Sequence, residues 1–244
     1  MKQAIFEIRS NRPLAPGVFE LVLAGDTTNF RAPGQFAALA LEGFYLRRPL
    51  SVCDWDADTL TLVYRTVGQG TAALSAYPPG RKLDLLTGLG NGYALAKSGD
   101  RPLLVGGGLG APPLYALARR LLETGCHPAV VLGFNRAEEV ILRPRFEALG
   151  LPVTVCTADG SLGVPGFVTA GMARAGAYSH VYACGPEPML RAVWEASPVP
   201  GQYSFEARMG CGFGACMGCS RPTRSGSKRI CREGPVLESE EILW

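Results

Sequence analysis

The sequence lacks several features that would assign it to common classes of protein. Its apolar runs are short and broken by Gly or Pro, and none approaches the roughly 20 residues that a membrane-spanning helix needs. The N-terminal stretch MKQAIFEIRS has an acidic residue where a signal peptide would carry its apolar segment. We therefore expect a cytoplasmic protein that does not enter a membrane.

Clustered positive charge and obvious catalytic groups are also missing. The net charge is only +3, and the basic residues are scattered, so nothing indicates a nucleic-acid partner. The sequence has two histidines, His127 before a proline in a turn and His180 at the start of a strand, and no G-x-S-x-G motif. We expect both histidines to be structural, and we assign no catalytic residue for acid–base or nucleophilic chemistry to this chain.

Three segments of different texture are present in the 244 residues. Residues 1–99 alternate short β-branched and aromatic stretches with Pro and Gly turns, which predicts a small antiparallel barrel. Residues 100–199 alternate apolar strands with helix-length stretches, which predicts a doubly wound parallel sheet. Residues 200–244 are rich in Gly and Cys and show almost no periodicity, so we expect a metal to organise this short segment.

Half of the eight cysteines lie in that last segment. Cys211, Cys216, Cys219 and Cys231 have the spacing C-x4-C-x2-C-x11-C, and the first three match plant-type [2Fe-2S] loops. The glycines between and beside them permit the positive φ angles of a loop wrapped tightly around a cluster: Gly210, Gly212, Gly214 and Gly218. Structural zinc is the rival interpretation, although it usually takes two separate short-spaced pairs of ligands; here Cys216 and Cys219 form one such pair and Cys231 stands alone. A loop of unliganded cysteines is the third alternative.

The middle segment opens with a glycine-rich turn. In LLVGGGLGAPPLYALARRL a strand leads into Gly106, Gly107, Gly108 and Gly110, and then into an amphipathic helix, an arrangement that presents backbone N–H groups to a phosphate. A second strand end, Cys184-Gly185-Pro186, is predicted at the same mouth of the sheet. The alternatives are a tight turn without a ligand and, for Cys184, a small buried residue.

The choice between NAD and NADP is left open by the second βα unit. Its strand ends in VVLGFNR, with no acidic residue at the strand end to hold a ribose 2′-hydroxyl. Arg136 follows directly and is suited to a 2′-phosphate.

Two stretches of the first segment are candidate phosphate-binding sites, one because of its arginines and the other because of its glycines. Arg47 and Arg48 precede Pro49, a residue that ends ladder pairing, and this suits a guanidinium directed at a pyrophosphate, although strand arginines are more often solvated edge residues. Gly68-Gln69-Gly70-Thr71 begins a helix-like stretch whose N-terminus is a second phosphate seat.

These motifs occur together, in the same order, in a known family. LRRPLS, YRTVGQGT, LLTGLGNGY, VGGGLGAPPLY, GSLGVPGFVT, VYACGPEPML and CGFGACMGCS…CREGPVL resemble the electron-transfer subunits of class 1B dihydroorotate dehydrogenase, within the ferredoxin reductase-like superfamily. The resemblance covers essentially the whole chain. It implies three flavin-binding segments, formed by Arg48, Pro49, Leu50 and Ser51, by Val63, Tyr64 and Arg65, and by Gly70 and Thr71.

The resemblance also implies the cofactors and the partner. It implies FAD in the barrel domain, NAD at the α/β domain and a [2Fe-2S] cluster held by the four cysteines, facing a separate FMN-containing catalytic subunit in a heterotetramer with two copies of each. Electrons would pass between NAD and the partner, which oxidises dihydroorotate to orotate in pyrimidine biosynthesis. The wider superfamily has an aromatic residue at the position of Leu50, so Tyr64 or Tyr93 is expected beside the flavin ring instead.

Two rival functions remain open from the sequence. Near relatives are flavin and iron–sulfur subunits of NADH-dependent ferredoxin or sulfide oxidoreductases. From a different class, a non-enzymatic, zinc-bearing interaction module on a degenerate reductase fold would carry the same cysteines.

Overall fold

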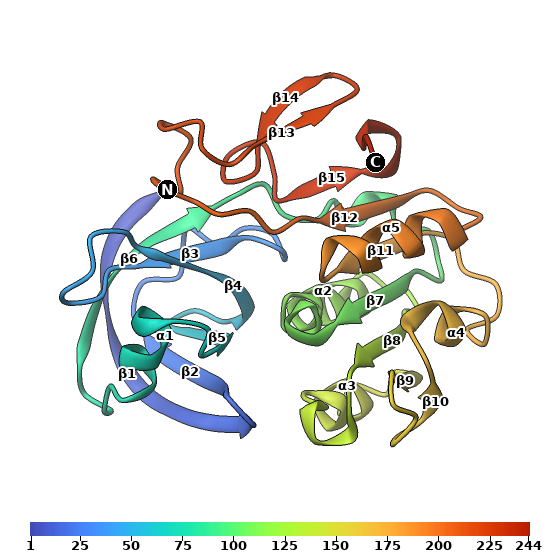
Figure 1. Ribbon diagram of the computed structural model, residues 1–244, viewed down its shortest axis with the longest axis horizontal. Helices are drawn as coiled ribbons and strands as arrows, with labels where there is room; N and C mark the ends of the chain where they lie inside the picture. Colours follow the sequence, from blue (N-terminus) through green and yellow to red (C-terminus); the bar gives the residue numbers. More distant parts are fainter.

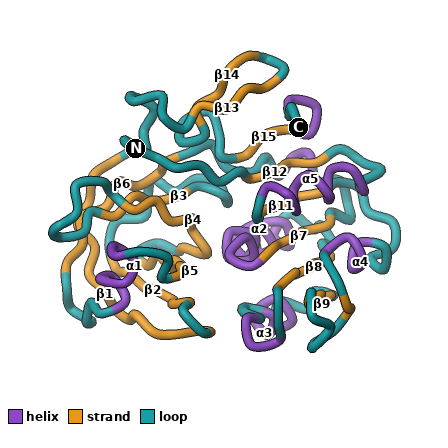
Figure 2. Tube along the Cα trace, in the orientation of Figure 1, coloured by secondary structure: helices purple, strands orange, loops and turns teal.

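The structure is a computed structural model that describes residues 1–244. A β-barrel and an α/β unit lie side by side, and the C-terminal segment lies along the top of both in the view of Figure 1. Figure 2 shows that most of the helix belongs to the α/β unit, whereas the barrel side is almost entirely strand and loop. None of the helices is long and apolar enough to cross a membrane.

The predicted antiparallel barrel is confirmed, with six strands closed in the order β1-β2-β5-β4-β3-β6. The strands are β1 (Lys2–Ala15), β2 (Val18–Ala24), β3 (Phe36–Leu39), β4 (Arg48–Trp55), β5 (Thr59–Arg65) and β6 (Lys82–Leu89), and one helix, α1 (Gln69–Ser75), follows β5. Inward-facing residues such as Phe6, Leu21 and Leu62 are fully buried and alternate with more exposed ones, which is the period of two expected of a barrel.

The predicted parallel sheet is also confirmed and lies within a seven-stranded sheet of order β10-β9-β8-β7-β11-β12-β15. Its parallel strands are β7 (Leu103–Gly107), β8 (Ala129–Phe134), β9 (Val153–Thr157), β10 (Val164–Pro165), β11 (Val181–Cys184) and β12 (Gly201–Ser204). The helices are α2 (Ala111–Glu123), α3 (Arg143–Ala148), α4 (Val168–Met172) and α5 (Glu187–Ala196). The strand order reverses between β7 and β11, and ligands of doubly wound folds bind at such a reversal.

The C-terminal segment has more structure of its own than the sequence predicted. β15 (Val236–Glu238) pairs antiparallel with β12, and β13 (Ser220–Thr223) and β14 (Gly226–Arg229) form a hairpin. Its buried residues share one apolar cluster with residues of the barrel: Phe205, Ile230 and Leu237 with Phe36 and Leu89. The segment is therefore anchored by sheet pairing and by apolar packing as well as by its cysteines.

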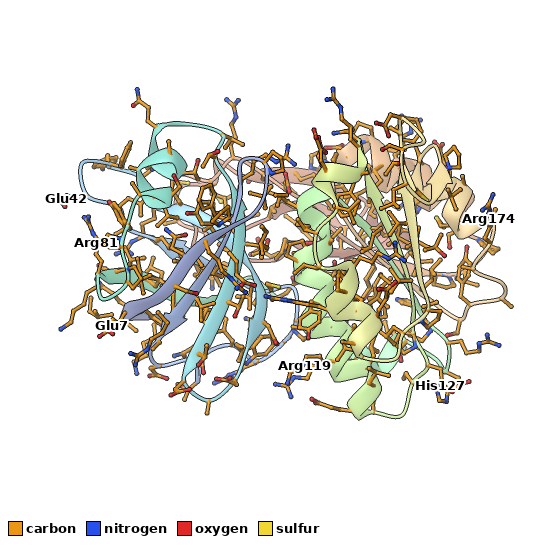
Figure 3. The ribbon with its side chains drawn as sticks, turned by 90° about the horizontal axis from the view of Figure 1, so that it is seen from below. Glu7, Glu42, Arg81, Arg119, His127 and Arg174 are labelled. Carbon is orange, nitrogen blue, oxygen red and sulfur yellow. The ribbon has the colours of Figure 1, made fainter.

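Helix α2 joins the barrel to the α/β unit. Its residues Leu114 and Leu117 belong to the same buried cluster as Val63 of the barrel. At the edge of this contact Arg119 of α2 donates to both carboxylate oxygens of Asp54 on β4, at 2.6 and 2.7 Å. Figure 3 shows Arg119 between the two units, with His127 and Arg174 at the far side of the α/β unit. The sites described next lie on elements that this contact holds together.

Candidate functional site

Three of the four cysteines of the C-terminal segment lie in one loop, and the fourth, Cys231, follows the β13–β14 hairpin; backbone N–H groups of both stretches point at cysteine sulfurs. Ala215 and Cys216 donate to Cys211 Sγ at 3.2 and 3.4 Å, and Gly218 donates to Cys216 Sγ at 3.5 Å. Cys231 N–H donates to Cys219 Sγ at 3.4 Å. Backbone donors aimed at cysteine sulfur stabilise thiolates and tune iron–sulfur clusters, so the loop fits such a group.

Burial divides the four thiols into an outer and an inner pair. Cys211 is partly exposed and Cys216 exposed, whereas Cys219 and Cys231 are buried. Burial opposes ionisation of Cys211, but N–H donors from Cys216, Phe213 and Ala215 outweigh it and lower its pKa to about 6. For Cys231, burial and then the neighbouring Cys219 raise the pKa to about 12. Cys231 therefore needs a bound cation to become thiolate at neutral pH, while the outer thiol Cys211 is ready to ligate.

The geometry around the thiols differs from the sequence prediction in two respects. No three of the chain's His, Cys, Asp or Glu side chains form a ready-made metal-ligand group; the thiols interact as two pairs, Cys211 with Cys216 and Cys219 with Cys231. Only two of the four glycines have positive φ, Gly212 (77°) and Gly214 (93°), and Met217 (61°) is the third such residue of the loop.

The other two glycines, Gly210 and Gly218, leave space beside a thiol. A Cβ on Gly210 would lie 3.2 Å from Cys216 Sγ, and one on Gly218 would lie 3.6 Å from the same sulfur. The expected positive φ angles of Gly210 and Gly218 were therefore wrong, and of the two only Gly210 lies close enough to a thiol for a side chain to be tight there.

Arg47, which precedes β4, and Arg48, the first residue of β4, have different environments. Arg47 donates to Asp84 at 2.9 and 3.2 Å and to the Asp84 carbonyl at 2.9 Å, so its charge is neutralised within the barrel. Arg48 has no carboxylate partner; it donates to the Leu46 carbonyl, and its guanidinium lies 4.7 Å from the centre of the Phe44 ring. Arg48 is therefore the arginine with charge available for an anion.

The guanidinium of Arg48 lies directly against Gly70 in the first turn of α1, where any Cβ would collide with it. The hydroxyl of Thr71 accepts from Val67 N–H at 3.0 Å and from Gly68 N–H at 3.3 Å, which fixes the turn before the helix. Arg48 of β4 and Gly70 of α1 thus come together, and Thr71 shapes the loop beside them. A pyrophosphate would meet one guanidinium and one helix N-terminus here.

The remaining predicted flavin residues lie on the same two strands. Arg48, Pro49 and Leu50 are half-buried at the start of β4, and Ser51 is exposed. Val63 and Tyr64 are buried near the end of β5, and Arg65 is half-buried at its end. These segments are adjacent in the barrel because both strands lie next to each other in its order.

Neither tyrosine proposed to flank a flavin ring is positioned to do so. Tyr64 is 1% exposed, its hydroxyl donates to Asn11 Oδ1 at 2.9 Å, and its ring stacks on Phe19 at 5.7 Å. Tyr93 is 2% exposed, and its hydroxyl donates to the Ala183 carbonyl at 3.0 Å. Both rings are used inside the protein, so that expectation was wrong, and Tyr64 offers only its main chain to a ligand.

A pocket of about 650 Å³ opens at the carboxyl ends of the strands where the sheet order reverses. Four of the predicted residues line it: Arg65, Gly107, Gly108 and Pro186. Gly108 has a positive φ of 53° and open space around its Cα, so its backbone is accessible to a ligand. The pocket therefore places a free arginine of the barrel opposite the glycine-rich turn of the α/β unit.

The other predicted residues of this region serve packing rather than the pocket wall. A Cβ on Gly110 would collide with the Cys184 carbonyl, and one on Gly106 would lie 2.9 Å from Ala111 Cα. Cys184 and Gly185 are buried. The glycines thus let the two strand-end loops cross at close range, and the Cys184 thiol, whose pKa burial raises to about 12, is inert at neutral pH.

Several lining residues were not predicted from the sequence. Asn135 and Glu139 follow β8, Phe167 precedes α4 and is 74% exposed, and Glu206 follows β12. An exposed aromatic in the quoted motif GSLGVPGFVT was the available signal for Phe167. Nothing in the sequence indicated that Glu139 and Glu206 line the pocket, because their position there depends on how the loops fold back.

A second hollow of about 670 Å³ lies at the opposite, amino-terminal edge of the sheet. It contains none of the predicted site residues, and its lining includes Arg101, His127 and Arg174. The glycine-rich turn, Pro186 and Arg65 lie on the other edge, so the pocket at the strand reversal is the functional candidate. His180 is buried against Tyr182, with ring centres 4.8 Å apart, which agrees with a structural role.

Comparisons with known proteins agree with this geometry. Residues 206–243, which include all four cysteines, match the family described as the iron-sulfur cluster binding domain of dihydroorotate dehydrogenase B. The dihydroorotate dehydrogenase B (NAD(+)) electron transfer subunit of Geobacillus sp. (strain WCH70) is 41% identical over 256 residues, covering 100% of this chain and 99% of its own. The Bacillus caldolyticus subunit of the same name is 42% identical over 249 residues, covering 97% and 96%. The chain belongs to this family.

Solved structures place the dihydroorotate dehydrogenase B subunit fold among reductases. A chain from the structure of an NADH-dependent reduced ferredoxin-NADP oxidoreductase superposes with a TM-score of 0.89 at 29% identity, covering 98% of this chain and 90% of that one. A ferredoxin NADP+ reductase from Neisseria gonorrhoeae superposes with a TM-score of 0.70 at 16% identity, covering 80% and 90%. The second match speaks for the fold alone, and both agree with the predicted ferredoxin reductase-like architecture.

Proposed function

We propose that this protein is the electron transfer subunit of an NAD-dependent dihydroorotate dehydrogenase. It passes electrons between NAD and a partner FMN subunit that oxidises dihydroorotate to orotate, in pyrimidine biosynthesis. The proposal rests on family membership over the full chain and on the spatial order of the three sites.

The order of the sites is the observation that carries the proposal. Arg65 belongs both to a flavin segment of the barrel and to the wall of the nucleotide pocket. At the other end, the position of a Cβ on Gly212 of the cysteine loop lies 3.9 Å from Ala38 Cβ, and Ala38 pairs with Pro49 of the first flavin segment. These contacts of the predicted flavin segments with the pocket on one side and with the cysteine loop on the other support a relay.

The residues of the chain divide the work of this relay. When bound, FAD exchanges a hydride with the nicotinamide and the [2Fe-2S] cluster carries single electrons. Arg48 and the first turn of α1 hold the FAD pyrophosphate, Gly107 and Gly108 bring bare backbone to the NAD phosphates, and the loop N–H groups neutralise the thiolates of Cys211, Cys216, Cys219 and Cys231. The remaining predicted site residues shape the FAD and NAD sites: Pro49, Leu50, Ser51, Val63, Tyr64, Arg65, Gly70, Thr71, Gly106, Gly110, Cys184, Gly185 and Pro186.

We also infer the setting of the protein. Residues 1–99 form the FAD domain, 100–199 the NAD domain and 200–244 the cluster segment, with β12 extending the sheet of the NAD domain into the last of these. The protein acts in the cytoplasm, in a heterotetramer with two FMN subunits. Support for a partner comes from the name that the relatives share, which describes a subunit.

Reconstitution with the partner tests the proposal. The isolated chain, loaded with FAD and cluster, is expected to oxidise NADH with ferricyanide as acceptor and to show no turnover of dihydroorotate. Addition of the FMN subunit should start NAD reduction by dihydroorotate. Dihydroorotate-dependent NAD reduction by the chain alone would overturn the relay, because a substrate site would then lie within these 244 residues.

The similarity to the ferredoxin-NADP oxidoreductase chain favours one second candidate, an NADH-dependent ferredoxin oxidoreductase subunit. The same preparation separates the two functions. Tight, stoichiometric association with the FMN subunit supports the first, and fast NADH-dependent reduction of ferredoxin without that subunit would support the second.

A further inference from the structure

The loop after β8 places one carboxylate in the wall of the nucleotide pocket. Glu139 lines the pocket together with Asn135, and its Oε2 accepts from Asn135 Nδ2 at 3.1 Å and from Asn135 N–H at 3.4 Å. Its second oxygen, Oε1, has no hydrogen-bond partner in the protein. The side chain is half-buried and held in place, so Glu139 offers an oriented, unused acceptor to a ligand.

Arg136, the residue that the sequence offered for a 2′-phosphate, faces elsewhere. It does not line the pocket, its side chain is 67% exposed, and it lies 3.8 Å from Glu138 in a surface ion pair. The cation next to the pocket is therefore already partnered by a carboxylate. Arg136 is therefore directed to the surface and not into the pocket.

A neighbouring loop adds a third carboxylate to the same region. Asp159 N–H donates to the Asn135 carbonyl at 3.1 Å, and Ser161 Oγ accepts from Ala137 N–H at 2.8 Å, so the loop after β9 packs on the loop after β8. Hydrogen bonds from Ser161 hold the pKa of Asp159 below its usual value. Glu138 and Asp159 thus both interact with Arg136, while Glu139 keeps Asn135 as its partner.

In doubly wound folds the adenosine ribose binds near the end of the second strand, where an acid can accept from its 2′-hydroxyl. We propose that Glu139 is the specificity-determining residue of the nucleotide pocket: its free oxygen accepts from a ribose 2′-hydroxyl and repels a ribose 2′-phosphate. No acidic residue lies at the end of β8 itself, and Glu139, five residues beyond that end, takes its place. This inference rests on the proposed function and names which dinucleotide the pocket takes and why.

Steady-state oxidation of NADH and NADPH by the FAD-loaded chain, with ferricyanide as acceptor, tests the role of Glu139. Glu139→Gln removes the charge and keeps the hydrogen-bonding shape. We expect its kcat/KM for NADPH to rise about 10-fold and that for NADH to fall several-fold, because one like-charge contact is exchanged for a neutral one. Both changes should appear in KM and not in kcat, since the ribose lies away from the transferred hydride.

Three further variants separate the charge of Glu139 from its effect on loop shape. Glu139→Asp keeps the charge, and its kcat/KM for NADPH is expected to stay as low as that of the wild type. Arg136→Gln tests the alternative phosphate ligand, and Glu147→Gln neutralises an exposed carboxylate that lies outside the pocket and pairs with Arg143. Neither of the last two should change the NADPH/NADH ratio by more than about two-fold.

Calorimetric titration with 5′-AMP and 2′,5′-ADP gives a readout that does not depend on flavin or cluster. The wild type should bind 5′-AMP more tightly, and Glu139→Gln should bring the two affinities together. An unchanged NADPH/NADH ratio in a folded Glu139→Gln variant that still oxidises NADH would overturn the inference and leave the proposed function intact. Failure of the FAD-loaded wild type to oxidise NADH at all would instead overturn the proposed function, and the inference with it.

Discussion

The cysteine loop and the nucleotide pocket are built in opposite ways. Three of the four thiols lie within nine residues, Cys211 to Cys219, and the N–H groups that point at the sulfurs come from this loop and from Cys231 itself. The pocket takes its wall from the barrel and from the loops after β7, β8, β11 and β12. A local site fails when one residue is lost, whereas a distributed site fails by degrees, and the variants below are chosen to test this difference.

The largest effect is expected at the buried pair of the cysteine loop. Cys231→Ser should abolish cluster retention, because Cys231 is 1% exposed and no other thiol outside the loop can replace it. The measurement is iron and acid-labile sulfide per chain after anaerobic purification, with two of each expected in the wild type, as a [2Fe-2S] formula requires. Cys126→Ser, outside the loop, is the matched control and should keep both. Stoichiometric zinc without iron in the wild type would contradict the cluster assignment.

The flavin site should respond in a graded way that separates the two arginines. Arg48→Ala should weaken FAD binding about 10- to 100-fold, since a charge-assisted hydrogen bond contributes about 1.5 to 3 kcal/mol. Arg47→Ala should instead lower the melting temperature of the barrel and leave FAD affinity nearly unchanged, because Arg47 is paired with Asp84. Fluorescence titration of apoprotein with FAD and thermal melts distinguish the two; equal FAD loss in both variants would be incompatible with the separate roles of these residues.

The outer surface of the cysteine loop offers a contact for the partner. Phe213 and Met217 lie between the ligands and are 39% and 54% exposed, which favours a contact surface over inward packing. Phe213→Asp should weaken assembly with the FMN subunit about 10-fold, as measured by analytical ultracentrifugation. NADH oxidation by the isolated chain should be unaffected. Unchanged assembly would place the partner on another surface.

The smallest effect concerns pH and the ion pair inside the barrel. Hydrogen bonds from Arg47 lower the pKa of Asp84, and partial burial opposes them. A carboxylate with a lowered folded-state pKa stabilises the protein above its unfolded pKa near 4, and this contribution disappears as the pH falls through the folded value. The difference in melting temperature between wild type and Asp84→Asn should therefore be largest above pH 5 and shrink below pH 4. A difference that stayed constant over this range would show that Asp84 acts through shape and not charge.

What the sequence predicted well follows the same division between local and distributed features. The barrel, the parallel sheet and the thiol set depend on alternation, apolar strands and cysteine spacing, all of which are local in the chain. From the sequence, only a family motif distinguished the role of Arg48 from that of Arg47. The structure adds a physical reason: Arg47 is paired with Asp84, which lies 37 residues away along the chain and could not be recognised as its partner from local sequence.

The features that the sequence missed depend on folding over long distances. Glu139 enters the pocket because its loop turns back on Asn135, and β15 completes the sheet by pairing with β12. Tyr64 and Tyr93 were expected beside a flavin ring because both are aromatic and near the motifs. The structure directs both rings inward, to Asn11 and to the Ala183 carbonyl, which no local pattern indicated.

Anaerobic addition of NADH to the isolated chain, followed by electron paramagnetic resonance, tests the relay most directly. The account predicts that an excess of NADH bleaches the flavin absorbance and produces the signal of a reduced [2Fe-2S] cluster, since the flavin takes two electrons and the cluster one. Arg48→Ala stripped of FAD should keep its cluster and give no such signal, because electrons have no path from the pocket to the thiols. A cluster that NADH reduced equally well without FAD, or a flavin that NADH reduced while the cluster stayed oxidised, would contradict the order of sites from pocket to flavin to cluster.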